Sequence, residues 1–447
     1  MTAALVEDRR EVFGWMLYDW ANSTFSTTVV STLLGPYLTG LAQGAVGENG
    51  ALLTVGGFVI VTAKSFFPFC VALSVLLQVF LLPLLGALAD YSQMKKRLMA
   101  FFCYAGVAAT CLLYFASEGR YLLGGMLFVV ANLTFGAANV LYNAFLGEIV
   151  SEERRDAVSS RGFALGYLGG GLLLAGNLLL MRAAPGLGIS MPLAVRLSLL
   201  SAGLWWGAFS VVTFGCLRTR AARRVLPRGK GYLAVGWSEL WQALAALRAL
   251  RHTMRYLVAY LFYNDGIQTV VSLASVLLAQ ELFVARGLPV DQSFLLGLSL
   301  MVQFVALFGA LLFERLAAWG TKNAILLSLV GWCGVVVYAY GALQTTRQAW
   351  WLAAVIAVVL GGSQALSRSL FSRMIPKGRE ASFFGLYEIS DRGTSWIGPV
   401  LFGLVVAATN SYRQAMLSLI VLFGVGSALL LLTDSDRAER DARLASA

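Results

Sequence analysis

Ionisable and amide side chains recur at helical spacing inside strongly apolar segments of this 447-residue chain. In the first such segment, Asp19, Asn22 and Ser23 follow the i, i+3, i+4 spacing that places side chains on one face of a helix. An ionisable group at the centre of a bilayer costs at least about 2.5 to 3.5 kcal/mol, so each one needs a partner or a function. Several such faces turned toward one space would form a polar cavity that binds a small solute.

Four later apolar segments carry comparable polar faces. The candidate residues for substrate binding or ion coupling are Asp19, Asn22, Asn139, Asn143, Asp265, Gln268, Gln364, Arg368, Glu388, Asp391 and Arg392. A guanidinium group suits a carboxylate ligand because the two form parallel hydrogen bonds, whereas a buried carboxyl group can hold a proton, a cation or an ammonium group. A cavity that offers both signs favours a zwitterion such as an amino acid or a small peptide.

The same residues also have purely structural interpretations. Amide and hydroxyl side chains commonly form hydrogen bonds between membrane helices. Glu388 and Arg392 are four residues apart and can pair on one helix face. Asp19 and Asp265 have no opposite charge within four residues on their own segments, so each must find a partner across the cavity, stay protonated or bind a cation. The glycine row at 162–170 indicates close helix packing more than a ligand site.

The composition places these segments in a membrane. The chain is 58% hydrophobic and 13% charged, against roughly a quarter charged in a soluble domain. Runs of about twenty apolar residues are long enough to cross a hydrocarbon core of about 30 Å as helices. We expect twelve of them, near residues 13–40, 66–89, 98–117, 121–149, 161–182, 192–217, 255–283, 293–316, 322–343, 350–374, 382–409 and 412–433. Residues 51–63 would reach only about 20 Å as a helix, so we expect an outer loop or an interfacial segment there.

The basic residues predict the topology. With the N-terminus in the cytoplasm, most of the 34 lysines and arginines fall in the inner loops, which indicates that both termini are cytoplasmic. The net charge of +11 therefore reflects membrane orientation and gives no support to nucleic-acid binding. Five scattered cysteines and one histidine favour neither a disulfide framework nor a metal site, and no cofactor or enzymatic motif is expected.

The longest inner loop divides the chain into two similar groups of six helices. The expected units are an N-terminal half at 1–217, a linker at 218–254 with an amphipathic helix near 238–250, a C-terminal half at 255–433 and a cytoplasmic tail at 434–447. Helices that carry the polar faces would surround the interior, while every third helix would face lipid. Such a plan is typical of a carrier that rocks one half against the other.

The segment 86–97, GALADYSQMKKR, resembles the inner-loop signature of the major facilitator superfamily, although Gln93 and Met94 depart from it. An acidic group at a helix end with basic groups one turn beyond can close or release an inner gate. The resemblance implies a gate formed by Asp90, Lys95, Lys96, Glu148 and Arg154.

Further motifs make the resemblance more specific. The segments YDWANS at 18–23, YNAFL at 142–146, RGFALGY at 161–167, YNDG at 263–266 and GSQALSRS at 362–369 are followed by Gly398-Pro399. Together they resemble the vacuole effluxer, or autophagy-related, branch of the superfamily. The resemblance implies an all-helical secondary transporter with the twelve-helix major facilitator fold, and the fungal members export amino acids from the vacuole.

The function predicted from these observations is secondary transport of a small polar solute by alternating access. We expect a small-molecule substrate, possible co-transport of a proton, a bacterial inner membrane and activity as a monomer. Carriers of sugars, nucleosides or drugs share these features, so the solute class stays open. A lipid scramblase or a nutrient sensor is a less favoured alternative, because the polar faces belong to interior helices and no large soluble domain is present.

Overall fold

The computed structural model describes residues 7–47, 50–55, 58–90, 94–219, 245, 247–289, 291–392, 397–409 and 411–445. Within these residues, eleven helical segments are long and apolar enough to cross a membrane, and Ile397–Val406 is a shorter apolar helix. Because the shorter helix belongs to the eleventh predicted span, the described helices fit the expected twelve-helix plan.

The first group of elements contains α1 (Arg9–Thr24), the π-helix η1 (Phe25–Leu33), α2 (Leu34–Val46), β1 (Ala51–Val55), β2 (Phe58–Thr62), α3 (Phe66–Asp90), α4 (Lys95–Leu112), η2 (Leu113–Phe115), α5 (Tyr121–Ile149), η3 (Glu152–Arg154), α6 (Arg155–Ala183), η4 (Ala184–Leu187) and α7 (Met191–Cys216). The second group contains α9 (Arg251–Leu282), η5 (Val284–Arg286), α10 (Gln292–Leu316), η6 (Ala317–Trp319), α11 (Thr321–Gly341), α12 (Thr346–Arg373), α13 (Glu380–Arg392), α14 (Ile397–Thr409), α15 (Tyr412–Ser418), α16 (Ile420–Leu431) and α17 (Ser435–Leu444).

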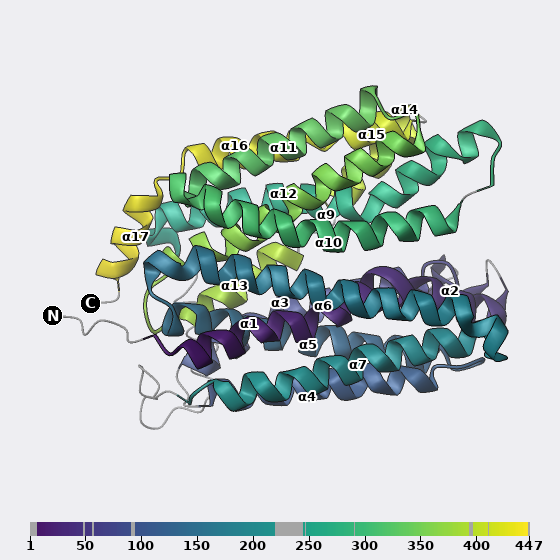
Figure 1. Cartoon of the computed structure of the whole chain (residues 1–447), viewed down its shortest axis with the longest axis horizontal. Coiled ribbons are helices and arrows are strands. Elements are labelled where there is room, and N and C mark those ends of the chain that lie inside the picture. The colour runs from purple at the N-terminus through teal and green to yellow at the C-terminus, as the bar shows by residue number, and fades with distance from the viewer. Residues whose placement is uncertain are drawn as a thin grey trace.

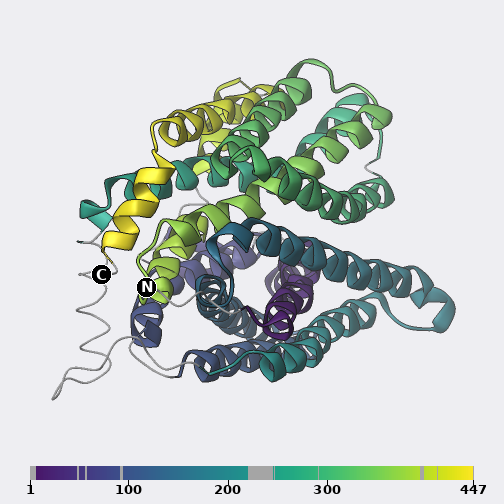
Figure 2. The same cartoon turned by 60° about the vertical axis from the view of Figure 1, so that its left-hand side comes forward.

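The two groups lie side by side along their length. Helices α1 to α7, purple to teal, gather in one group, and the green and yellow helices gather in the other (Figures 1 and 2). The two groups also contact each other: α13 packs against α3 and α5 of the first group as well as against α9, and α10 and α12 pack against α6. The start of α1 and the whole of α17 lie at the same end of the bundle, on the left of Figure 1, which we call the termini end. Residues 220–244 and 246 of the linker, with most of the predicted amphipathic helix, lie outside the described residues.

The structure adds detail to three segments of the sequence prediction. In the expected outer loop or interfacial segment, β1 pairs with β2 in an antiparallel arrangement, with Ala51 opposite Thr62. Its threonines and valines favour strands. The described residues of the eleventh span form α13 and α14, and residues 393–396 lie outside the described residues. The tail forms the helix α17.

Small residues allow the closest helix contacts, as expected where lipid gives no hydrophobic drive for helices to associate. A Cβ atom at Gly361 of α12 would lie 2.2 Å from the carbonyl oxygen of Ala306 on α10. On α6, a Cβ atom at Gly169 would lie 2.5 Å from the carbonyl oxygen of Trp20 on α1. Both pairs of helices lie beside the space between the two groups, so glycine sets how closely the walls of that space approach.

Candidate functional site

A polar cavity of about 300 Å³ lies between the two groups of helices. Nine of the predicted binding or coupling residues line it: Asp19, Asn22, Asn139, Asn143, Gln268, Gln364, Arg368, Glu388 and Asp391. They come from α1, α5, α9, α12 and α13, the helices that correspond to the five polar faces in the sequence. The π-helix η1 adds Ser26, Thr27 and Ser31, because its wider turns present hydroxyl groups that a regular helix would place elsewhere.

An ion pair joins the two groups of helices at this cavity. The Arg368 Nη2 atom lies 3.0 Å from Asp19 Oδ2, and Nη1 lies 3.4 Å from Oδ1. Arg368 is 4% exposed and Asp19 is 7% exposed. Asp19 therefore finds its partner across the cavity, one of the three outcomes that the sequence left open.

The surroundings of Arg368 fix the direction of its guanidinium group. Ser159 of α6 accepts hydrogen bonds from Nε, 2.9 Å to its hydroxyl oxygen, and from Nη2, 3.0 Å to its backbone carbonyl oxygen. The guanidinium carbon also lies 4.2 Å from the ring centre of Phe163, 4.8 Å from that of Trp15 and 5.6 Å from that of Tyr142. Cations are stabilised over aromatic faces at such distances. The sequence pattern did not single out these partners as site residues, because serine and aromatic side chains are common in membrane helices.

Glycine at position 162 allows α6 to approach the ion pair. A Cβ atom there would lie 2.6 Å from Asp19 Oδ2 and 3.2 Å from Arg368 Nη2, so Gly162→Ala must displace the carboxylate. We expect a loss of about 1–3 kcal/mol in stability, as for other overpacked sites, together with loss of solute binding. Gly176→Ala, on the same helix with open space around it, is the matched control and should leave the melting temperature unchanged or raised. Equal melting temperatures of the two variants would contradict this role for Gly162.

The other cavity residues form a second set of cross-links. Asn143 accepts a hydrogen bond from Arg368 at 3.5 Å and donates one to Glu388 at 3.0 Å, so it connects the ion pair to α13. Within the first group of helices, Asn22 donates to Asn139 at 2.9 Å. The remaining cavity bonds are Tyr167 to Gln364 at 2.8 Å and Tyr260 to Asp391 at 2.6 Å.

Two predicted residues are not among the described residues that line the cavity. Asp265 of α9 is buried and binds the backbone N–H of Gly398, at 2.5 Å, outside the cavity wall. Arg392 ends α13, but its side chain lies outside the described part of the chain, so its predicted pairing with Glu388 stays a prediction.

A larger space of about 440 Å³, which we call the vestibule, continues from the cavity. The two spaces share Thr27, Ser31, Val271, Gln303 and Leu360 in their linings. The vestibule then runs between apolar side chains toward the end opposite the termini end, where Leu278 near the end of α9 and Ala349 near the start of α12 line it. A solute would therefore reach the ion pair from that end.

At the termini end, the inner-loop signature joins α3 to α13. Asp90 accepts hydrogen bonds from the backbone N–H of Ala381 at 3.0 Å and of Ser382 at 2.8 Å, and from the Ser382 hydroxyl at 2.6 Å. These N–H groups belong to the first turn of α13, which has no intrahelical partners for them. A Cβ atom at Gly86 would lie 2.2 Å from the Ala381 carbonyl oxygen, which explains why the signature has glycine there.

The other predicted gate residues have different positions. Lys95 lies 2.6 Å from Glu148 and 3.9 Å from Asp90, so these three charges form one cluster with the start of α13. Lys96 donates to the Leu217 carbonyl oxygen at 2.6 Å, and Arg154 pairs with Glu7. Both of these contacts stay within the first group of helices and do not cross the gate.

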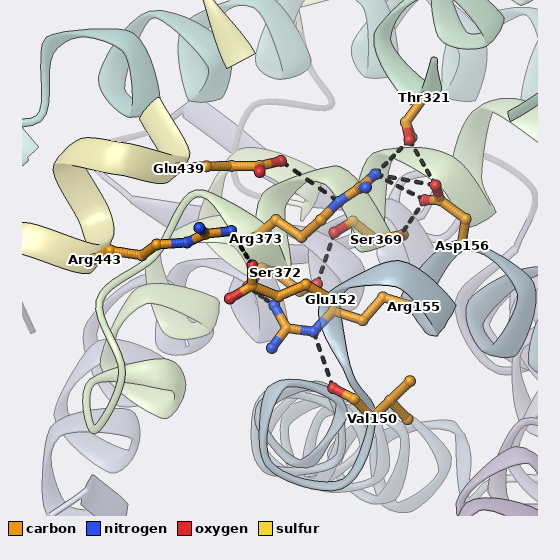
Figure 3. Close-up of polar contacts among 10 residues, drawn as sticks. All are labelled: Val150, Glu152, Arg155, Asp156, Thr321, Ser369, Ser372, Arg373, Glu439 and Arg443. Carbon is orange, nitrogen blue, oxygen red and sulfur yellow. Dashed lines mark hydrogen bonds and ion pairs between the residues drawn. The ribbon is translucent and has the colours of Figure 1, made fainter. Parts of the chain in front are cut away.

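A second set of contacts, drawn in Figure 3, closes the same end from α6 to α12. Asp156 pairs with Arg373 at 3.0 Å and accepts hydrogen bonds from Ser369 and Thr321, both at 2.6 Å. Arg155 adds a bond of 2.7 Å to the Ser372 carbonyl oxygen. Sequence reasoning missed these residues, although the basic residues of this region were used for topology. The cavity is thus closed at the termini end and continues toward the opposite end.

The tail helix α17 covers this closed end. Its Arg443 pairs with Glu152 of the first group, while its Glu439 lies 3.8 Å from Arg373 of the second (Figure 3). Its side chains Ala438 and Ala442 are buried. Helix α17 therefore contacts both groups of helices in this state.

Burial raises the pKa of Glu439 above its ordinary value, despite the opposing effect of Arg373. Glu439 therefore binds a proton more tightly when α17 is docked than when it is undocked. As a result, docking of α17 becomes more stable as the pH falls from neutral through the raised pKa of Glu439 toward its ordinary value near 4.5. We expect backbone hydrogen exchange over 435–444, corrected for intrinsic rates, to slow across this interval. Glu439→Gln should remove the pH dependence. Exchange that accelerates at lower pH in the wild type would contradict the direction of the shift.

The two groups of six spans surround a central polar cavity, which is open toward one end and closed at the other. This arrangement defines a membrane transporter of the major facilitator class. A family model described as "Vacuole effluxer Atg22 like" matches residues 7–443. The chain belongs to this vacuole effluxer family, whose members and structural neighbours are transporters and not enzymes.

Relatives and solved structures support this assignment. The chain is 32% identical over 419 residues to the uncharacterized MFS-type transporter YxiO of Bacillus subtilis, with 93% of each chain covered. It is 28% identical over 467 residues to autophagy-related protein 22 of Eremothecium gossypii, covering 94% of this chain and 89% of that one. Among solved structures, the transporter FucP in its outward conformation matches with a TM-score of 0.67 and 12% identity, covering 95% of this chain and 98% of the other, which shows the shared fold.

Proposed function

We propose that the protein is a proton-coupled secondary transporter that exports a small zwitterion, an amino acid or a small peptide, from the cytoplasm of a bacterium. The observation that supports this most strongly is the buried Asp19–Arg368 pair in the cavity. The opposite charges come from different groups of helices, so a bound solute would bridge the two parts that must move relative to each other.

The ion pair favours a zwitterion on physical grounds. Separating two buried charges leaves each without a partner, which is strongly unfavourable. A sugar or a nucleoside has no full charges to replace them. A zwitterion can place its carboxylate on Arg368 and its ammonium group on Asp19, so that both buried charges keep a partner of opposite sign.

Proton coupling is supported by buried carboxyl groups within the membrane-spanning helices, because such groups can take up and release a proton during a transport cycle. Export is supported by the family's description as effluxers, and a bacterial inner membrane by the Bacillus relative. The complete cavity within one chain supports a working monomer.

The test is a thermal-shift screen of the purified protein against amino acids, dipeptides, sugars and nucleosides. A ligand that binds the folded state raises the apparent melting temperature with its concentration. We expect a shift with an amino acid or dipeptide that is lost in Arg368→Ala and in Asp19→Asn. Shifts with sugars or nucleosides alone, equal in wild type and variants, would show that the solute class and the site are wrong.

A further inference from the structure

Asp265 lies in a separate polar site behind the cavity wall. It is 1% exposed, and it lies on α9 one helical turn from the cavity residue Gln268. Its Oδ2 atom accepts a hydrogen bond of 2.5 Å from the backbone N–H of Gly398, at the beginning of α14. Its Oδ1 atom has no hydrogen-bond partner among the described residues.

The contact with Gly398 requires an unusually close approach of α9 and α14. A Cβ atom at position 398 would lie 2.1 Å from Thr269 Oγ1 and 3.2 Å from Asp265 Oδ2. Glycine therefore allows the start of α14 to reach the carboxyl group.

Among the described side chains of the neighbouring elements, the charged groups have other partners, and the side chain of Arg392 at the end of α13 lies outside the described residues. On α13, Asp391 is bound by Tyr260 and Asn264, at 2.6 and 2.9 Å. On α12 and α15, Arg368 pairs with Asp19 and Arg413 pairs with Glu281. Helices α14 and α16 contain no ionisable residues. Within the described part of the chain, the Asp265 carboxyl group therefore has a backbone N–H group on one oxygen and no counter-charge on the other.

We propose that Asp265 binds the transported proton at Oδ1, in a site separate from the solute cavity. This inference rests on the proposed transport function and assigns its coupling site. A proton suits this position better than a metal cation, because a metal needs several oxygen ligands and the described surroundings supply few. Proton binding neutralises the carboxylate and weakens its attraction for the Gly398 N–H group, while Oδ2 stays in place.

The location explains how the proton would act on the gate. Helix α14 packs against α9, while α13, the other part of the same span, packs against α3 and α5 of the opposite group. Asp265 thus attaches α14 to α9, and α14 belongs to the same predicted span as α13, which closes the termini end. A change in its charge alters the attachment of α14 and favours one position of the span over the other.

Transport in proteoliposomes tests the coupling role. The two assays are accumulation driven by a pH gradient and counterflow exchange without a gradient, both with the amino acid found in the thermal-shift screen. We expect Asp265→Asn to abolish gradient-driven accumulation while exchange stays within about twofold of wild type. Glu281→Gln, on the same helix but paired with Arg413, is the matched control and should retain both activities. The proposal would be overturned if Asp265→Asn still accumulated the solute fully, or if a sodium gradient drove accumulation instead of a proton gradient. The proposed function would be overturned if the wild-type protein exchanged none of the solutes.

A second measurement needs no solute. Infrared difference spectra of the purified wild-type protein, recorded between two pH values, should contain a carboxylic acid C=O band from Asp265. We expect Asp265→Asn to lose this band and Glu281→Gln to keep it. An unchanged band in Asp265→Asn would show that Asp265 does not exchange a proton, whatever the transported solute is.

Discussion

Replacing Arg368 with alanine is expected to abolish solute binding and transport. The substitution removes the basic half of the buried pair and leaves Asp19 without its partner. Loss of one member of a buried, hydrogen-bonded charge pair costs about 2–5 kcal/mol, which corresponds to at least about 30-fold in affinity. Counterflow uptake of the labelled solute by proteoliposomes measures the effect.

Two further variants make the result specific. Arg368→Lys keeps the positive charge but loses the planar, two-pronged hydrogen bonding, so it should bind more weakly than wild type and better than Arg368→Ala. Arg347→Ala removes an exposed arginine from the first turn of the same helix and should transport normally. If Arg368→Ala transports as well as Arg347→Ala, the guanidinium group does not hold the solute.

Replacing Asp90 with alanine is expected to open the gate at the termini end. The substitution removes three hydrogen bonds to the first turn of α13, each contributing about 1 kcal/mol. If the closed state loses about 3 kcal/mol of stability and the open state loses none, the ratio of closed to open molecules changes about 100-fold. Alkylation of a cysteine introduced at the buried Ala365, in a chain without its five native cysteines, should become at least about tenfold faster.

The matched control is another aspartate that caps a helix. Asp291 accepts a hydrogen bond of 3.0 Å from the backbone N–H of Phe294 at the start of α10, and this contact stays within one element. Asp291→Ala should cost a similar capping energy without exposing position 365. Equal labelling of position 365 in the Asp90 and Asp291 variants would mean that Asp90 stabilises α13 without closing a gate.

The sequence predicted the spans and most of the cavity because both depend on periodicity. Asn22, Asn139 and Gln364 lie in the cavity because polar residues at helical spacing must share a face, and the interior is where lipid does not reach. The inner-loop signature likewise located Asp90 and Lys95 at one closed end. The cavity inference needed only spacing and the cost of burying charge, whereas the gate inference came from the family resemblance.

The remaining features depend on three-dimensional contacts that spacing does not encode. Ser159 holds Arg368 from a helix whose pattern indicated only glycine packing. Asp265 and Asp19 look alike in sequence, yet one binds the backbone N–H of Gly398 and the other faces an arginine. Strands β1 and β2 pair with each other, an arrangement that hydropathy alone does not distinguish from an interfacial helix.

Binding of chemically altered solutes tests the central claim most directly. The solute identified in the thermal-shift screen is compared with its amide, which lacks the carboxylate, and with its N-acetyl form, which lacks the ammonium group. If the zwitterion lies between Asp19 and Arg368, each altered form should bind at least about 30-fold more weakly. Binding of both forms as tight as that of the parent solute would contradict the claim that this ion pair is the solute site.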